Sequence, residues 1–218
     1  MTHSADHPVL IKGHVLTFVA SPMTMPPQEA VRLEEALLIE DGKITAVGPS
    51  ETLRQQAPSA HVRDMGEALL LPGFVDAHVH YPQTAIIASW GKRLRDWLET
   101  YTFPEEARFG DADYAAHIAA GYLDLALAHG TTTVSSFCTI HSESVSAFFT
   151  AAARRGMRVV GGKTCMDCNA PEILRDTAQS AYDDSKALIE TWHGQRRLRY
   201  AITPRFAPTS TPDQLEAL

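Results

Sequence analysis

The first third of the chain contains short, mostly apolar runs of strand length that are interrupted by polar residues. Three such regions are separated by polar segments: residues 9–20, 36–48 and 61–65. The middle region contains Asp41-Gly42, a dipeptide typical of a two-residue hairpin turn, so we predict two strands there. The pattern predicts a small antiparallel β module that is too small to bury a core by itself.

From Leu69 onward, apolar runs alternate with amphipathic segments of helical length. Asp111 is suited to begin one of these helices, and Gly130 and Gly156 are suited to follow helix ends. Alternating strands and helices predict a parallel sheet with right-handed crossovers. The expected strands cover residues 69–80, 131–137, 158–165 and 198–206, and the expected helices cover residues 111–129, 142–155 and 171–193.

The last residues predict the start of one more helix. Thr211 offers a hydroxyl cap and Pro212 suits the first helical position, yet the chain ends at Leu218. The strand–helix units before this point make up half of the eight in a (β/α)8 barrel, a fold of about 250 residues. We therefore expect an α/β protein with a β module at residues 1–68 and the first half of a barrel at residues 69–218, truncated after the fourth βα unit.

Composition is that of an ordinary soluble globular protein, with 44% hydrophobic and 21% charged residues. The net charge of −7 comes from interspersed acids and bases, so no nucleic-acid partner is expected. No apolar run approaches the ~18 residues of a membrane helix, and the N-terminus lacks a signal-peptide pattern. The odd number of cysteines, three, argues against a disulfide framework and favours a reducing compartment, so we expect a cytoplasmic protein.

The stretch PGFVDAHVHYPQ carries the clearest chemical signal. Successive side chains of a strand point to opposite faces, so His78 and His80 should project together while Val79 faces a core. The run before them, residues 69–76, has the pattern of a parallel strand buried on both faces. The C-terminal ends of such strands carry the active sites of α/β barrels. Two neighbouring imidazoles form half of a zinc site, although an H-x-H pair also arises by chance among 10 histidines.

Five segments together resemble the guanine deaminases of bacteria, which belong to the amidohydrolase superfamily. They are PGFVDAHVHYPQT, SWGKRLRDWLETYTFPEEARF, GTTTVSSF, GKTCMDCNAPE and AITPRFAPTS. The resemblance implies a metal-bearing (β/α)8 barrel of the TIM type, with a flanking β-sandwich to which residues 1–68 contribute. It also implies that the complete protein is a homodimer of purine metabolism, hydrolysing guanine to xanthine and ammonia.

The resemblance implies a role for five residues. His78 and His80 are the first two zinc ligands, and Gln83, Arg205 and Phe206 hold the purine. The remaining ligands, a substrate-contacting histidine and the proton-shuttling glutamate are expected on later strands, so no catalytic residue is expected within this segment. A guanidinium fork matches the paired acceptors O6 and N7 of guanine, and an amide can both donate and accept. The strand that carries Arg205 has no lysine, which favours a single metal ion.

Other interpretations of these residues remain open. Arg205 could be an exposed strand-end arginine, and Phe206 could belong to the core. The aromatic stretch at residues 90–103 is more typical of core packing, or of a loop that covers a pocket, than of a cofactor site. Lys163 is assigned no metal role.

Other functions remain open as well. The complete protein could be an amidohydrolase that acts on a different aminated or halogenated heterocycle. The pattern His141-Ser142-Glu143 with Cys165 and Cys168 resembles zinc deaminases of the cytidine-deaminase fold, but Thr164 replaces their proline. A protein that ended at Leu218 would be an inactive half-barrel remnant with unpaired edge strands, or an interaction piece completed by another chain.

Overall fold

The computed structural model describes residues 7–21 and 23–218, and the chain divides into two compact units, Met1–Pro72 and Gly73–Leu218. The first unit contains a four-stranded sheet in the order β3-β2-β1-β4. Its elements are β1 (Val9–Phe18), α1 (Pro27–Ala30), β2 (Val31–Glu40), β3 (Lys43–Gly48), α2 (Ser50–Gln56) and β4 (His61–Leu70). Its small core consists of Leu10, Ala36, Leu38, Leu53, Ala57 and Ala60.

The hairpin predicted in this unit is confirmed. Asp41 and Gly42 lie between β2 and β3 with φ values of 49° and 71°, the positive values that a type I′ turn requires. The prediction of a purely antiparallel module was wrong, because β4 pairs with β1 in parallel. The physical reason is α2, which crosses over between β3 and β4 and buries Leu53 in the core, so that β4 returns in the direction of β1.

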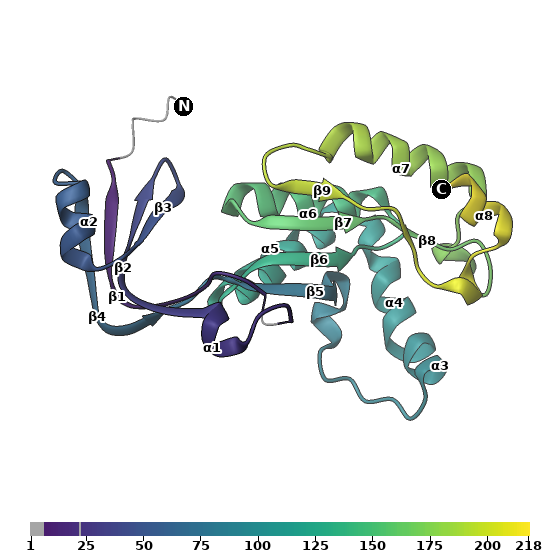
Figure 1. Cartoon of the computed structure of the whole chain (residues 1–218). Helices are drawn as coiled ribbons and strands as arrows, with labels where there is room; N and C mark the ends of the chain where they lie inside the picture. The colour runs from purple at the N-terminus through teal and green to yellow at the C-terminus, as the bar shows by residue number, and fades with distance from the viewer. Residues whose placement is uncertain (1–6, 22) are drawn as a thin grey trace. The chain divides into compact units, whose positions relative to one another are not determined.

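The second unit contains a parallel sheet in the order β5-β6-β7-β9, as Figure 1 shows. β8 and β10 form a separate two-stranded parallel sheet. The strands are β5 (Phe74–His80), β6 (Thr131–Phe137), β7 (Arg158–Gly162), β8 (Thr164–Cys165), β9 (Leu198–Tyr200) and β10 (Thr203–Pro204). The main helices are α5 (Ala112–Ala128), α6 (Ser142–Arg155), α7 (Ala178–Trp192) and α8 (Pro212–Ala217).

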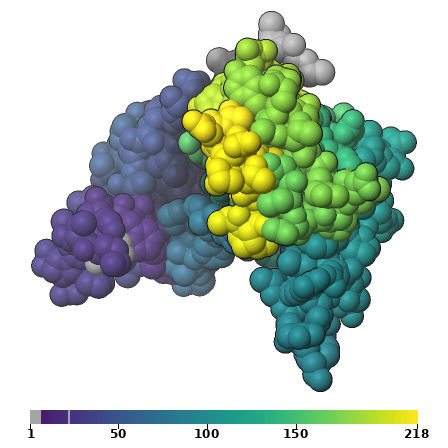
Figure 2. Space-filling model, turned by 90° about the vertical axis from the view of Figure 1, so that its right-hand side faces the viewer, coloured from purple at the N-terminus to yellow at the C-terminus, as the bar shows by residue number. Residues whose placement is uncertain are grey.

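Helical turns fill the connection between β5 and α5. They are the 3-10 helix η1 (Tyr81–Ile86), α3 (Leu94–Trp97), the π-helical η2 (Leu98–Thr102), α4 (Phe103–Glu106) and the 3-10 helix η3 (Ala107–Gly110). Two further 3-10 turns are η4 (Glu172–Leu174) and η5 (Ala207–Thr209). Figure 2 shows the segment that contains α3 and α4, in teal, projecting beside the yellow C-terminal segment.

Two of the predicted helix boundaries are confirmed, and both are explained by capping residues. Asp111 accepts hydrogen bonds from the backbone N–H groups of Asp113 and Tyr114 and begins α5. Gly156, with a φ of 66°, follows α6. The helix predicted from residue 171 instead begins at Ala178, because Thr177 and Ser180 form a reciprocal capping box there.

The first predicted barrel strand differs from its expectation in two ways. Leu69 and Leu70 complete β4, so β5 begins only at Phe74. The run is also not buried on both faces, since Phe74 is 55% and Val75 65% exposed. Within the described residues β5 lies at the edge of its sheet, which explains this exposure.

The core of the second unit lies between the sheet and its helices. Val134 of β6, Phe148 and Phe149 of α6 and Leu198 of β9 are fully or almost fully buried in it. Within residues 7–21 and 23–218, no helix combines the length and the hydropathy that crossing a membrane requires.

Candidate functional site

The two histidines of the H-x-H motif lie side by side at the C-terminal end of β5. The ring centroids of His78 and His80 are 5.5 Å apart, and both rings contact Phe137 at the end of β6. His80 stacks on that ring at a centroid distance of 4.9 Å, while Val79 packs against the core on the opposite face. The prediction that the two imidazoles share one face of the strand is confirmed.

His80 is in a state suited to bind a metal ion. Burial, together with the positive charge of Arg205 and the neighbouring imidazole of His78, lowers the pKa of His80 to about 4, so its ring is neutral at physiological pH. Its Nδ1 is buried and makes no hydrogen bond to any group in the described part of the chain. Buried polar atoms are rarely left unpaired, and neutral imidazole nitrogen is a zinc ligand. The pair therefore fits a zinc ion.

The described residues do not complete a metal site around this pair. Among the residues that the structure describes, no three His, Cys, Asp or Glu side chains are placed together as a metal site. Zinc takes four ligands in structural sites and at least three protein ligands in catalytic ones. The result also argues against the cytidine-deaminase-type arrangement of His141, Cys165 and Cys168.

Two of the three predicted purine-binding residues meet at a buried carboxylate. Gln83 lies on η1, directly after the histidines, and Arg205 directly follows β10. Glu106 of α4 forms a bidentate ion pair with the guanidinium of Arg205, with Nη2 donating to Oε1 at 3.0 Å. The amide nitrogen of Gln83 donates to the same Oε1 at 3.3 Å. The alternative of an exposed Arg205 was wrong, because its side chain is only 5% exposed.

No role was predicted for Glu106 from the sequence. It is 1% exposed, and its neighbour Glu105, 6% exposed, pairs with Arg108 instead. The available signal was a pair of acids inside a stretch otherwise rich in aromatic residues. The sequence could not reveal which cation each acid would meet, since Arg205 is 99 positions from Glu106.

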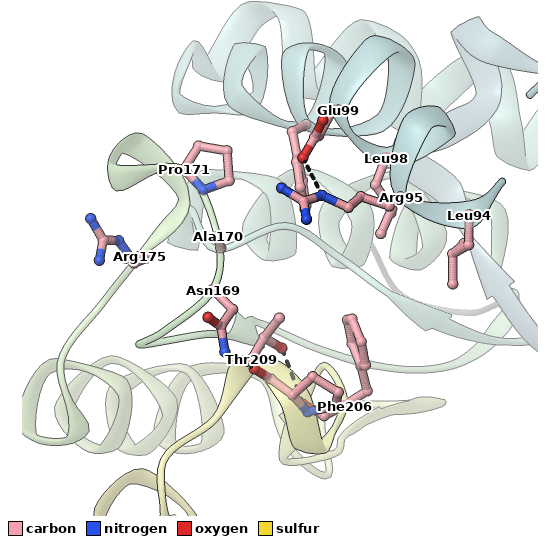
Figure 3. Close-up of a pocket in the computed structure, with 12 residues that line it drawn as sticks. Leu94, Arg95, Leu98, Glu99, Asn169, Ala170, Pro171, Arg175, Phe206 and Thr209 are labelled. Carbon is pink, nitrogen blue, oxygen red and sulfur yellow. Dashed lines mark hydrogen bonds and ion pairs between the residues drawn. The ribbon is translucent and has the colours of Figure 1, made fainter.

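Phe206 directly follows Arg205 in the chain but lines a different pocket from His80 and Gln83. It is 39% exposed, which excludes plain core packing, and it lines a pocket of about 800 Å³ together with Phe103. Figure 3 shows this pocket between the helical turns that carry Leu94 and Leu98 and the loop that carries Ala170. His80 and Gln83 line a different hollow of about 340 Å³. The described residues therefore do not enclose all five predicted positions in one pocket.

Lys163 has a partner that the sequence did not predict. It is 1% exposed, between β7 and β8, and its Nζ lies 2.5 Å from Oδ2 of Asp176. The other oxygen of Asp176 accepts hydrogen bonds from the backbone of Met166 and the amide of Gln214 on α8. This network joins the strand ends to the following helices.

Residues 69–218 match the model of the Amidohydrolase family. The chain belongs to the amidohydrolase family. Within the β module of this amidohydrolase, residues 36–60 also match the imidazolonepropionase-like composite domain of bacteria. Guanine deaminase of Escherichia coli K12 is 48% identical over 180 residues, which cover 82% of this chain and 41% of that protein.

Solved structures agree with this family. The crystal structure of guanine deaminase from Bradyrhizobium japonicum superposes with a TM-score of 0.93 at 37% identity, over 96% of this chain and 46% of that one. Guanine deaminase from C. acetobutylicum, solved with bound guanine, gives a TM-score of 0.84 at 27% identity. The match covers 96% of this chain and 49% of that one. The amidohydrolase chain thus spans about half the length of the relatives it matches, and its predicted α/β fold is confirmed.

Proposed function

We propose that this amidohydrolase chain provides the first two zinc ligands and the purine-binding residues of a guanine deaminase. The complete protein would hydrolyse guanine to xanthine and ammonia. The observation that carries this proposal is the joining of Gln83 and Arg205 by Glu106, with Gln83 lining the same hollow as His80. The names of the relatives, one of them solved with guanine, support the substrate.

Each residue has a chemical task in this proposal. His78 and His80 would hold zinc, which when bound supplies a hydroxide nucleophile near neutral pH. Arg205 would donate to the O6 and N7 acceptors of the purine, and Gln83 would pair with another polar position on the ring. Phe206 would provide an apolar wall beside the flat ring. A carboxylate outside residues 1–218 would move the proton, and a cytoplasmic homodimer of purine metabolism remains part of the proposal.

The substrate assignment is tested by assaying the complete protein with guanine and following xanthine and ammonia release. Adenine, cytosine and an aminated or chlorinated triazine serve as comparison substrates. We expect guanine to have the highest kcat/KM. Preference for one of the other rings would instead favour the alternative amidohydrolase reaction.

The metal ligands are tested by His78→Ala and His80→Ala in the complete protein. Either change removes one zinc nitrogen ligand, so we expect loss of bound zinc in elemental analysis and loss of nearly all turnover. His117→Ala is the matched control, because His117 is exposed on α5 and far along the chain from the motif. Full zinc occupancy in either motif variant would contradict the assignment.

Purine recognition is tested by Arg205→Lys, which keeps the charge but removes the planar fork. Loss of a bidentate guanine contact is worth about 1–3 kcal/mol, so kcat/KM for guanine should fall roughly 10- to 100-fold. The measurement is steady-state kinetics on protein of verified zinc content. Unchanged kinetics would show that Arg205 has only a structural role.

A further inference from the structure

Glu106 is a buried acid with two partners, and both are proposed substrate-binding residues. Its side chain is 1% exposed, and its carboxylate is engaged by Arg205 through both oxygens and by Gln83 through Oε1. These partners come from opposite ends of the second unit's sequence, η1 and the residue after β10. A single carboxylate thus fixes two side chains that the fold would otherwise hold independently.

The carboxylate determines which atoms Arg205 can offer to a ligand. A guanidinium has five N–H donors. The two bonds to Glu106 use one hydrogen on each Nη, which leaves the Nε hydrogen and one hydrogen on each Nη. Phe103, on the same helix as Glu106, lies with its ring 5.8 Å from the guanidinium carbon and restricts its plane further. The guanidinium plane of Arg205 is therefore fixed, and three of its N–H donors are not used by Glu106.

The carboxylate also determines the orientation of the Gln83 amide. An ionised carboxylate only accepts hydrogen bonds, so the Gln83 nitrogen must face Glu106. The amide oxygen then faces away from Glu106, and it makes no hydrogen bond to protein within residues 7–21 and 23–218. Glu106 thereby presents Arg205 as a donor and the oxygen of Gln83 as an acceptor. Guanine has both kinds of group at its edge, because O6 and N7 accept while its ring N–H and amino groups donate.

We propose that Glu106 is the positioning residue of the purine site, and that it sets the preference for a ring bearing an oxo group beside donor N–H groups. This inference rests on the proposed guanine deaminase function. Glu106 does not touch the substrate in this proposal. It acts through the orientations of Arg205 and Gln83, and a loss of Glu106 should therefore change substrate preference rather than turnover alone.

The test compares two substrates in the complete, zinc-loaded protein. Guanine has the O6 acceptor, whereas 2-aminopurine retains the amino group to be removed but lacks O6. Glu106→Gln keeps the shape of the side chain and removes its charge, so both Arg205 and Gln83 lose their fixed orientations. We expect kcat/KM for guanine to fall roughly 10- to 100-fold, mainly through KM, with a much smaller change for 2-aminopurine.

Glu105→Gln is the matched control. Glu105 lies on the same helix, is also buried and also pairs with an arginine, but its partners are Arg108 and Tyr114. A purely structural role of buried acids on α4 predicts that both variants lower the rates on both substrates equally. The positioning role predicts that only Glu106→Gln reduces the preference for guanine. The double variant Arg205→Lys with Glu106→Gln should prefer guanine almost as much as Arg205→Lys alone, because both changes act on the same contact.

Other outcomes separate the two proposals. Guanine binding to the zinc-free protein, measured by calorimetry, should weaken in Glu106→Gln and not in Glu105→Gln. If Glu106→Gln does not fold, Glu106→Asp and Glu105→Asp carry the same comparison with the charge retained. Wild-type protein that neither binds nor hydrolyses guanine would overturn the proposed function together with this inference. If the Glu106 variants keep the same ratio of kcat/KM for guanine to kcat/KM for 2-aminopurine as the wild-type protein, the positioning role alone is overturned.

Discussion

At the scale of single residues, the most consequential contacts are made by buried charges. Lys163 and Asp176 form an ion pair whose side chains are 2% and 6% exposed. Removing one partner of such a pair leaves an unpaired charge in a medium that solvates it poorly. The contrast within the same unit is Arg155 with Asp124, where the aspartate is 66% exposed and water screens the interaction.

We expect Lys163→Met to lower the free energy of unfolding by about 3–5 kcal/mol, the usual cost of breaking a buried pair. Asp124→Asn on the exposed pair should lower it by at most about 1 kcal/mol. Both are measured by urea unfolding of the complete protein. If Lys163→Met lowers the free energy of unfolding by less than Asp124→Asn does, the buried pair has no structural role.

The residues that were predictable from sequence are those whose geometry is local. His78 and His80 share a face because the period of a strand is two, whatever surrounds it. The partner of Arg205 depended on contacts between positions far apart in the chain, and only the folded structure supplies it. Sequence similarity gave Arg205 and Phe206 their expected roles, but not the buried acid between Arg205 and Gln83.

At the scale of elements, the caps at Asp111 and Gly156 and the hairpin turn were predictable, whereas the capping box at Thr177 and the interruptions of the strands were not. Asp111 begins α5 and Gly156 follows α6 because each acts on its own helix. The strands predicted at residues 158–165 and 198–206 are each broken in two. At the end of β7, a Cβ on Gly162 would lie 1.9 Å from the carbonyl oxygen of Ala201, which shows a close approach between distant segments at this break.

That close approach gives a prediction for a pair of glycine substitutions. Gly162→Ala should destabilise the protein strongly, because the added methyl group overlaps a backbone atom that cannot move without disturbing β10. Gly121→Ala is the matched change, because Gly121 lies within α5 with nothing within 4 Å of its added Cβ. It should raise the free energy of unfolding by about 0.5–1 kcal/mol through helix propensity. Thermal unfolding of both variants provides the measurement, and equal melting temperatures would contradict the argument.

At the scale of the whole molecule, the described part of the second unit has an exposed sheet edge and only two of the proposed zinc ligands. Within the described residues β5 pairs with a strand on one side only, and Val75 on this strand is 65% exposed. Unpaired strand edges pair readily with other chains. Two imidazoles alone also hold zinc weakly, because they leave half of its coordination to water. The four-strand parallel arrangement was predictable from the alternating pattern, but the exposure of β5 was not.

We therefore expect residues 1–218, expressed alone, to bind zinc poorly, to self-associate and to be inactive on guanine. Val75→Lys places a charge on the exposed edge and should shift the protein towards monomer in size-exclusion chromatography. Ile173→Lys is the control, because Ile173 is 64% exposed but lies on η4, away from that edge. Xanthine release is followed over hours in zinc-supplemented buffer against a sample without protein. Steady turnover above that sample would contradict the view that these residues need further strands and ligands to function. The same holds if residues 1–218 are monomeric both with and without Val75→Lys.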